Sequence, residues 1–441
     1  MRSFRFRVLC VLLCFLLATA FVSCAEQEND DPQHDSTVKA LDMSLVTHGG
    51  LFQMQAVSDA GCYEIYNHID GHGKLFFYDF ATNQISFVTN QPIPTDDETN
   101  PGWVSDTMGG VTPIFAGDSL YLFKRGALPL PTENHPGYES YIIKMTPDGT
   151  NRQRIYLSAW QEFGSGEIAF DGKHLYFLIN EYNSETSLLE QCYLCRTDFE
   201  SLQLEVLHEL GTDSAYSLAA VYEEGLILQR FSEIGVTVDE YNMEVPLLEN
   251  TAVLYSLHDD ALTDTGITWE NGTISYTFGT NAKMYYTLLD EQILRVYDLY
   301  SSESAVVCDT LNVDSLILNS VYIEGSIIDN HIPLYFSALI QSEQGTFLQD
   351  IPYYYDLETN SVVKVEFEDI AGIDEANTYI VGETEEVFFL CIGSRYVATT
   401  VTSQNGDTYT FDELILEYAT IAKEDYWNSA ANFMLFTDQV H

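Results

Sequence analysis

Two histidines and one aspartate lie close together in residues 68–73, which read His-Ile-Asp-Gly-His-Gly. Imidazole and carboxylate groups are common ligands of transition metals, so such a loop could bind an ion. The same residues also read as a glycine-rich turn between two apolar runs, and no further protein ligand can be assigned from the sequence. We therefore predict neither a metal site nor a cofactor.

Cys192 and Cys195 have the spacing of a metal-binding pair, but they lie in the apparent strand QCYLCR. Residues three apart in a strand face opposite sides of the sheet, and no second pair completes a tetrahedral site. Beyond Cys24 the cysteines are odd in number, which implies no disulfide framework. The sequence favours buried, apolar cysteines.

Residues 117–120 read Gly-Asp-Ser-Leu, which resembles the signature of the GDSL hydrolase family. In that family the serine opens a helix of an α/β/α domain. Here Ser119 is followed by Leu-Tyr-Leu-Phe, which is typical of a strand, and is preceded by a hairpin turn. We therefore predict a hairpin and no catalytic serine.

Four scarce arginines fall in different apparent repeats. They are Arg125, Arg230, Arg295 and Arg395. Sialidases grip a carboxylate with three arginines through bidentate hydrogen bonds. No matching sialidase motif accompanies these residues, and the many acidic side chains of the chain are simpler partners. No catalytic residue is predicted.

The sequence repeats a pattern of paired apolar runs. The strands that these runs predict must position the candidate residues named above. Clear copies lie at 75–88, 141–157, 192–207, 253–269, 293–308 and 353–367, with a degenerate copy at 414–427. A second hairpin precedes most of them, which gives four strands per unit. We take Asp79, Thr146, Thr197, His258, Asp298 and Asp356 as equivalent marks, spaced 40–67 residues apart. Residues 41–441 are therefore predicted to form one all-β domain, a β-propeller of seven four-stranded blades, with six or eight as alternatives.

Residues 264–269 match the core of the Asp-box, D-x-G-x-T-W. In sialidase-like propellers this motif sits on the turn between the two outer strands of a blade. The resemblance implies a structural role in such a turn for Asp264, Gly266, Thr268 and Trp269, and it implies no sugar substrate.

The first residues carry Arg2, Arg5 and Arg7, followed by an apolar run that ends at Ser23-Cys24. This order resembles the lipobox leader of bacterial lipoproteins, although Phe21 stands where that family prefers leucine. The resemblance implies cleavage before Cys24 and attachment of a diacylglyceryl group to its sulfur. A secretory signal without lipid and an uncleaved anchor remain alternatives. We expect a signal peptide at 1–23, a lipidated cysteine with an acidic tether at 24–40, and a position on the extracytoplasmic face of the bacterial cell membrane.

Charge limits the partners of the chain, because it has 67 acidic residues and only 18 basic ones, which gives a formal net charge of −49. Nucleic acid binding needs cationic side chains that neutralise phosphates, so it is excluded. Adsorption to anionic lipid is disfavoured for the same reason. The membrane contact that we expect is the lipid anchor.

As a whole the chain is similar to acidic, propeller-type bacterial lipoproteins, for which no activity is implied. The resemblance is carried by the lipobox, by hairpins such as YYYDLETNSV and by the closing IAKEDYWNSAANFMLF. The function predicted is a membrane-anchored, non-enzymatic scaffold that binds an envelope protein or a glycan. The alternative is an extracellular glycan-active or hydrolytic enzyme on the same fold.

Two apolar segments lack a local partner, residues 51–57 and residues 432–436. A propeller must join its first and last blades, since open sheet edges aggregate. We therefore expect the two segments to lie in one sheet, or at least in the same blade.

Lipidation at Cys24 can be tested by metabolic labelling. We expect Cys24→Ala to remain uncut by the lipoprotein signal peptidase and to incorporate no palmitate, because the sulfur is the acylated atom. Equal labelling of this variant and the wild type in cells fed radiolabelled palmitate would rule the anchor out.

Overall fold

The computed structural model describes residues 41–47, 53–67, 72–89, 95, 97, 99–104, 107, 110–125, 140–212, 214–238, 243–289, 291–311, 313, 316–342, 345–367, 378–402 and 408–438. The predicted leader and tether, with Cys24, and residues 68–71 lie outside this part of the chain, so what is predicted for them stays a prediction. No helix in the described part is long and apolar enough to cross a membrane.

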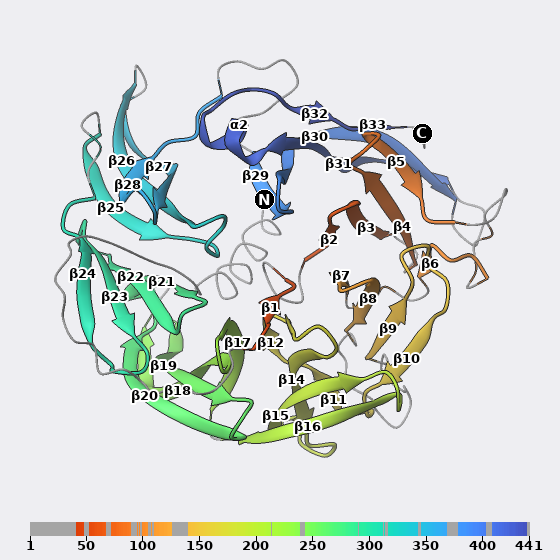
Figure 1. Ribbon diagram of the computed structural model, residues 1–441, viewed down its shortest axis with the longest axis horizontal. Helices are drawn as coiled ribbons and strands as arrows, with labels where there is room; N and C mark the ends of the chain where they lie inside the picture. Colours follow the sequence, from red (N-terminus) through yellow and green to blue (C-terminus); the bar gives the residue numbers. More distant parts are fainter. Residues whose placement is uncertain are drawn as a thin grey trace. The chain divides into compact units, whose positions relative to one another are not determined.

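The described strands form seven sheets, each built on four strands that follow one another in the chain (Figure 1). Pairing within each set of four is antiparallel. The fold is a β-propeller, which confirms the predicted all-β class and the prediction of seven blades. By internal contacts the chain divides into two compact units. The first is Met1–Gln53, Phe123–Lys144 and Gln153–Lys364, and the second is Met54–Leu122, Met145–Arg152 and Val365–His441.

The first unit holds four whole sheets. Their strands are β13 (Ala169–Phe170), β14 (Leu175–Tyr182), β15 (Leu189–Asp198) and β16 (Gln203–Gly211); β17 (Ala215–Tyr222), β18 (Gly225–Val238), β19 (Glu244–Ser256) and β20 (Ala261–Glu270); β21 (Ile274–Gly279), β22 (Lys283–Leu288), β23 (Leu294–Asp298) and β24 (Ser304–Cys308); and β25 (Leu318–Ile323), β26 (His331–Ser342), β27 (Gly345–Asp356) and β28 (Ser361–Val363). Three short strands extend the first two sheets, namely β1 (Ser44–Leu45), β11 (Gln161–Phe163) and β12 (Ser165–Gly166).

The second unit holds two whole sheets. Their strands are β2 (Gln55–Ser58), β3 (Gly61–Asn67), β4 (Gly73–Asp79) and β5 (Gln84–Phe87), with β6 (Trp103–Val104) and β33 (Thr437–Asp438) added; and β29 (Tyr379–Glu383), β30 (Val387–Thr402), β31 (Thr408–Ala422) and β32 (Met434–Leu435). A short helix, α2 (Lys423–Trp427), follows β31. The remaining sheet, with residues in both units, has β7 (Val111–Ala116), β8 (Ser119–Lys124), β9 (Tyr141–Met145) and β10 (Gln153–Tyr156).

The same side-chain device closes the last hairpin of several sheets. An aspartate carboxylate accepts the backbone N–H groups two and three residues later, and the fourth residue after it has a positive φ. The aspartates are Asp79, Asp198, Asp298 and Asp356, and the residues with positive φ are Asn83, Leu202, Ser302 and Asn360. Asp79, Asp298 and Asp356 are among the positions that the sequence repeat marked as equivalent. A fourth mark, Thr197, lies one residue before Asp198.

The C-terminal end of the described chain joins the sheet that begins with β2, inside the second unit. β33, near the C-terminus, pairs in parallel with β5 and so joins the sheet that begins with β2. β32, two residues earlier, is the last strand of the other sheet and pairs with β31. The prediction that residues 51–57 and 432–436 share a sheet or a blade is therefore wrong, because the chain passes from one sheet to the other at Phe436: residues 434–435 pair in the adjacent sheet, and only residues 437–438 join the sheet of β2.

Aromatic side chains fill the joint between these two sheets. The ring of Phe436 lies 5.5 Å from that of Tyr78, 6.2 Å from Phe80 and 5.8 Å from Phe389. Phe389 in turn stacks on Tyr418 at 4.9 Å. Such contacts bury apolar area and add favourable ring geometry, so the C-terminal segment is part of the core of this unit.

A carboxylate network spans the same joint. Glu64 on β3 accepts hydrogen bonds from the hydroxyls of Tyr78 and Tyr418, each at 2.5 Å, and from Gln55 Nε2 at 2.7 Å. Tyr418 is nearly buried, and its burial, together with the charge of Glu64, raises the pKa of its phenol. The phenol therefore stays protonated and can donate to the carboxylate, which ties β31 to β3.

Truncation after Asn428 is expected to lower the melting temperature markedly, because it removes β32, β33 and Phe436. Phe436→Ala alone should cost about 2 kcal/mol, less than a fully buried phenylalanine, since its ring is only partly buried. Met434→Ala, at a side chain that is 54% exposed, is the matched control and should change little. A truncated chain that melts with the wild type would show that these strands are a loose tail.

Candidate functional site

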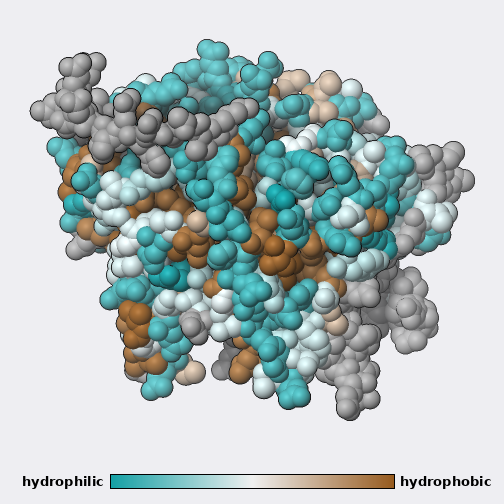
Figure 2. Space-filling view, turned by 60° about the horizontal axis from the view of Figure 1, so that its bottom comes forward, coloured by the Kyte–Doolittle hydropathy of each residue, from teal (hydrophilic) through white to brown (hydrophobic). Residues whose placement is uncertain are grey.

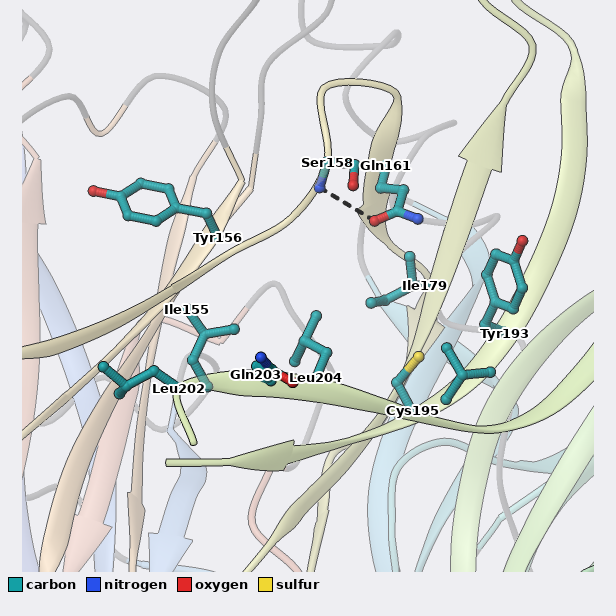
Figure 3. A pocket seen from close by; sticks show the side chains of 11 residues that line it. Ile155, Tyr156, Ser158, Gln161, Ile179, Tyr193, Cys195, Leu202, Gln203 and Leu204 are labelled. Atoms are coloured by element: carbon teal, nitrogen blue, oxygen red, sulfur yellow. Dashed lines mark hydrogen bonds between the residues drawn. The ribbon is translucent and has the colours of Figure 1, made fainter. Parts of the chain in front are cut away.

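A groove of about 340 Å³ lies in the first unit beside the outermost strand β16. Side chains from β10, β11, β14, β15 and β16, and from the adjoining turns, line it. Figure 3 shows Ile155, Ile179, Cys195 and Leu204 pointing into a shared space. The floor is therefore apolar, as in most sites that take organic ligands.

Strand alternation explains why these side chains meet. On β15, Tyr193 and Cys195 face the groove, whereas Cys192 and Leu194 belong to the core between this sheet and the next. Cys192 and Cys195 therefore face opposite sides of the sheet, which confirms the prediction. No disulfide joins them, and both are buried.

The thiol in the groove is a poor nucleophile. Burial raises the pKa of Cys195 to about 12, and the neighbouring Cys192 adds to this shift. The reactive form of cysteine is the thiolate, which is scarce at neutral pH when the pKa is this high. Cys195 thus contributes apolar surface to the floor.

The rim of the groove exposes apolar side chains to solvent. Tyr156 is 52% exposed, Leu202 45% and Val206 52%. On the face shown in Figure 2, hydrophobic side chains lie among a largely hydrophilic surface. Single exposed apolar residues are ordinary, but three around one hollow favour a binding surface.

One end of the groove is polar. The Ser158 N–H donates to Gln161 Oε1 at 3.2 Å, the contact drawn in Figure 3, and Gln161 Nε2 donates to Glu181 at 2.9 Å. Glu209 pairs with Tyr193 across the β15–β16 ladder. Two carboxylates therefore stand near Tyr193, and nearby β10 carries Arg154, which lies over the Tyr141 ring.

The Asp-box-like residues lie within β20 and not on the turn that the resemblance implied. The turn between β19 and β20 comes earlier, at residues 257–260. Asp264 and Thr268 pair with Val253 and Thr251 of β19, so residues 265–267 form a bulge in the strand. The motif adds residues that have no pairing partner on β19, and the pairing with β19 continues on both sides of them. The motif therefore forms a bulge within β20 and not a turn between two strands.

The bulge is held by local contacts. Asp264 Oδ1 accepts the Gly266 N–H at 2.9 Å, and Gly266 has a φ of +72°, which favours glycine. Asp264 Oδ2 also pairs with Arg230 at 2.7 Å. The buried Trp269 ring lies 4.7 Å from that of Tyr276 on β21.

Ser119 follows a hairpin turn, as predicted. It opens β8 directly after the turn at 117–118, is only 6% exposed, and donates to Asp118 at 2.9 Å. A serine held this way in a sheet does not open a helix, in contrast to the GDSL pattern.

Three of the four arginines pair with a carboxylate of their own sheet or its connecting turn. Arg230 pairs with Asp264 at 2.7 Å, Arg395 with Glu417 at 3.1 Å, and Arg295 with Glu291. These three arginines therefore pair with nearby acidic side chains, which is the simpler interpretation that the sequence favoured.

His72 stacks on Trp103, with ring centroids 4.0 Å apart. The other members of the predicted glycine-rich turn, residues 68–71, lie outside the described residues. Within the described ranges no three His, Cys, Asp or Glu side chains are grouped as metal ligands would be.

A second ionisable group in the first unit centres on Asp171. Its carboxylate accepts the N–H groups of Lys173 at 2.8 Å and His174 at 2.6 Å, and the Tyr176 hydroxyl at 2.7 Å. Burial acts to raise the pKa of Asp171, but hydrogen bonds from the His174 amide, Tyr176, the His174 ring and the Lys173 amide outweigh it and lower the pKa to about 2. These contacts fix the turn before β14.

No family of proteins matches the chain by its family model, and no curated protein matches it in sequence. Solved structures resemble it weakly. A putative 6-phosphogluconolactonase from Bacteroides fragilis is 10% identical, with 88% of this chain and 97% of that chain covered and a TM-score of 0.32. A β-fructofuranosidase from Bombyx mori is 13% identical, with 84% of each chain covered and a TM-score of 0.30.

An acylaminoacyl peptidase from Pyrococcus horikoshii is 12% identical, with 69% of this chain covered and a TM-score of 0.36. The chain spans about half of that peptidase, 51% of its length. At such identities and scores the likenesses carry no statement about activity.

The pH dependence of stability tests the Asp171 contacts. Because the pKa of Asp171 is lowered from 3.8 to about 2, the ionised carboxylate stabilises the folded chain above pH about 4, by about 2 kcal/mol, and this contribution is lost as the pH falls through about 2. Asp171→Asn should therefore lower the urea midpoint near pH 6 and have little effect near pH 2.

Glu200→Gln is the control for this experiment, since its side chain is 80% exposed and should matter little at either pH. A difference between Asp171→Asn and the wild type that stays constant over the pH range would contradict the assignment.

Proposed function

We propose that the chain is a lipid-anchored, extracytoplasmic binding protein that holds a partner or an envelope ligand in the groove beside β16. The observation that carries the proposal is the combination of an apolar floor with an exposed apolar rim. Ile155, Ile179 and Cys195 supply the floor, and solvent-exposed Leu202 and Val206 supply part of the rim. The rim gains free energy when a ligand removes it from water, whereas the floor residues are already buried and only shape the hollow.

The anchor is the second part of the proposal. The basic leader, the apolar run and Ser23-Cys24 support acylation of Cys24, and the acidic residues after it support a solvated tether. A tethered body stays at the bacterial cell membrane while the groove remains open to the extracytoplasmic space. The net charge of −49 keeps the body away from anionic polymers.

The chemistry of the groove supports binding over catalysis. Its thiol is protonated at neutral pH, and the Gln161 side chain accepts the Ser158 backbone N–H and donates to Glu181. A general acid or base must have a proton to exchange near neutral pH, which these groups lack. The proposal is therefore a non-enzymatic scaffold whose ligand is an envelope protein, peptide or glycan.

Two arginine substitutions at matched positions test the proposal. Val206 on β16 is 52% exposed and lines the groove, whereas Val306 on β24 is 55% exposed on the outermost strand of another sheet. The full lipidated protein, purified from membranes, is heated with panels of envelope glycans, muropeptides and peptides. Binding at about 100 times the Kd would stabilise the fold by about 2.7 kcal/mol and raise the melting temperature.

We expect at least one ligand class to raise the melting temperature of the wild type and of Val306→Arg, but not of Val206→Arg. Release of a cleaved product in the same samples would favour the enzymatic alternative. If no class gives a shift that depends on Val206, the groove is not the binding site.

A further inference from the structure

Two hairpins of the first unit are much longer than the sheet that lies between them (Figure 1). β18 and β19 have 14 and 13 residues, and β26 and β27 have 12 each, whereas β22 and β23 of the intervening sheet have only 6 and 5. One apolar core joins β18 and β19 to β21 and β22, and another joins β22 and β23 to β25, β26 and β27. β18 is buried over its first residues and largely exposed over its last ones, so its hairpin extends beyond the core.

The two long hairpins lie at the same end of the unit. In each sheet the four strands alternate in direction, so the middle hairpin lies at the end where the chain enters and leaves the sheet. Only three residues separate β20 from β21, so these two sheets run in the same direction. The link between β24 and β25 contacts both of the other middle hairpins, because the Leu311 N–H donates to the Gln292 carbonyl after β22 and the Ile317 carbonyl accepts the Leu339 N–H of β26.

On each long hairpin, apolar side chains continue the core face into solvent. Val236 and Val238 lie on the face of the β18–β19 ladder that carries the core residue Ala252, because side chains alternate along a strand. Phe347 lies on the face of the β26–β27 ladder that carries the core residue Phe336. Val236 is 60% exposed, Val238 58% and Phe347 47%. Core faces that continue uncovered in this way favour an interaction surface.

The charge of these hairpins selects the partner. Residues 231–249 and 339–350 include acidic side chains and have no lysine or arginine. Exposed Glu244 pairs with Val238 in the ladder, beside the hairpin tip, so it lies on the same face as the apolar side chains. A second copy of the chain and an anionic lipid surface would both bring negative charge to this face, which disfavours them. A cationic partner with an apolar face complements it.

We infer that Val236, Val238 and Phe347, here called the hairpin surface, dock a basic amphipathic helix of a partner protein. Its apolar face covers the hairpin surface, and the basic residues that flank this face lie near Glu244 at the rim. Packed sheets are spaced about 10 Å apart and a helix with its side chains is about 10–12 Å across, so one helix has the width of the layer that the short sheet leaves unfilled. The hairpin surface is separate from the groove beside β16, and the inference does not depend on that groove.

Diffuse attraction to an acidic protein is the competing explanation for any binding of a basic peptide, so the probes and variants must hold charge constant. The first probe is a fluorescent helical peptide of leucine and lysine with all its leucines on one face. The second has the same composition, with the leucines spread around the helix. The test variant is Val236→Thr with Val238→Thr, which keeps charge and side-chain shape. Val306→Thr on β24 is the control at matched exposure, and Val206→Thr reports on the groove beside β16.

We expect the one-faced peptide to bind the full lipidated protein, as measured by fluorescence anisotropy. Its Kd should rise roughly tenfold in the double variant, because two apolar contacts are lost, and the spread peptide should bind the wild type at least tenfold more weakly. Val206→Thr and Val306→Thr should bind as the wild type does. A photoreactive copy of the one-faced peptide should crosslink within residues 231–249 or 339–350.

Equal binding of the two peptides, or no binding of either, would overturn the inference. This comparison uses only the wild type, so a folding defect in a variant cannot obscure it. Binding that is lost in Val206→Thr and kept in the double variant would assign the peptide to the groove beside β16. A dimer of the full protein that the double variant disperses would make a second copy the occupant, and protection of Gly225–Val238 from hydrogen exchange by zwitterionic vesicles alone would make it a lipid surface; either result contradicts the inference.

Discussion

Burial of the sheet faces is the constraint on which this structure depends. Within the first unit, neighbouring four-stranded sheets share apolar cores, such as the one that Trp269 and Tyr276 form between β20 and β21. Inner strands are therefore apolar on both faces, and β8 is buried at every position. What remains for recognition is the outermost strand of each sheet and the turns, because only these present main chain and variable side chains to solvent.

This constraint explains how much of the fold could be predicted from sequence. Apolar runs joined by short polar turns repeat with the blades, and the aspartates that cap those turns, such as Asp298 and Asp356, are local signals. The position of the Asp-box-like residues could not be predicted, since a bulge and a turn need the same short motif of Asp and Gly. Only the pairing register of β20 against β19 distinguishes the bulge from a turn.

The groove escaped prediction for a different reason. Ile155, Ile179 and Leu204 are ordinary strand residues, and each would be assigned to the core from its own neighbourhood. They form a hollow because β10 of one sheet contributes to the same space as β14, β15 and β16 of another sheet. The opposite orientations of Cys192 and Cys195 were predictable, since strand alternation sets them, but which of the two would line the groove was not.

The joint in the second unit has a consequence for how the chain folds. This unit is assembled from residues 54–122, 145–152 and 365–441, and Gln55 bonds to Tyr418, 363 positions away. Contacts of such separation form late, because closing a long loop costs entropy before any contact repays it. The intervening sheets, with mostly local pairings, can order first. During synthesis the early strands β2 to β5 therefore keep their apolar faces uncovered until the far end of the chain arrives. That interval is when a chaperone would matter most.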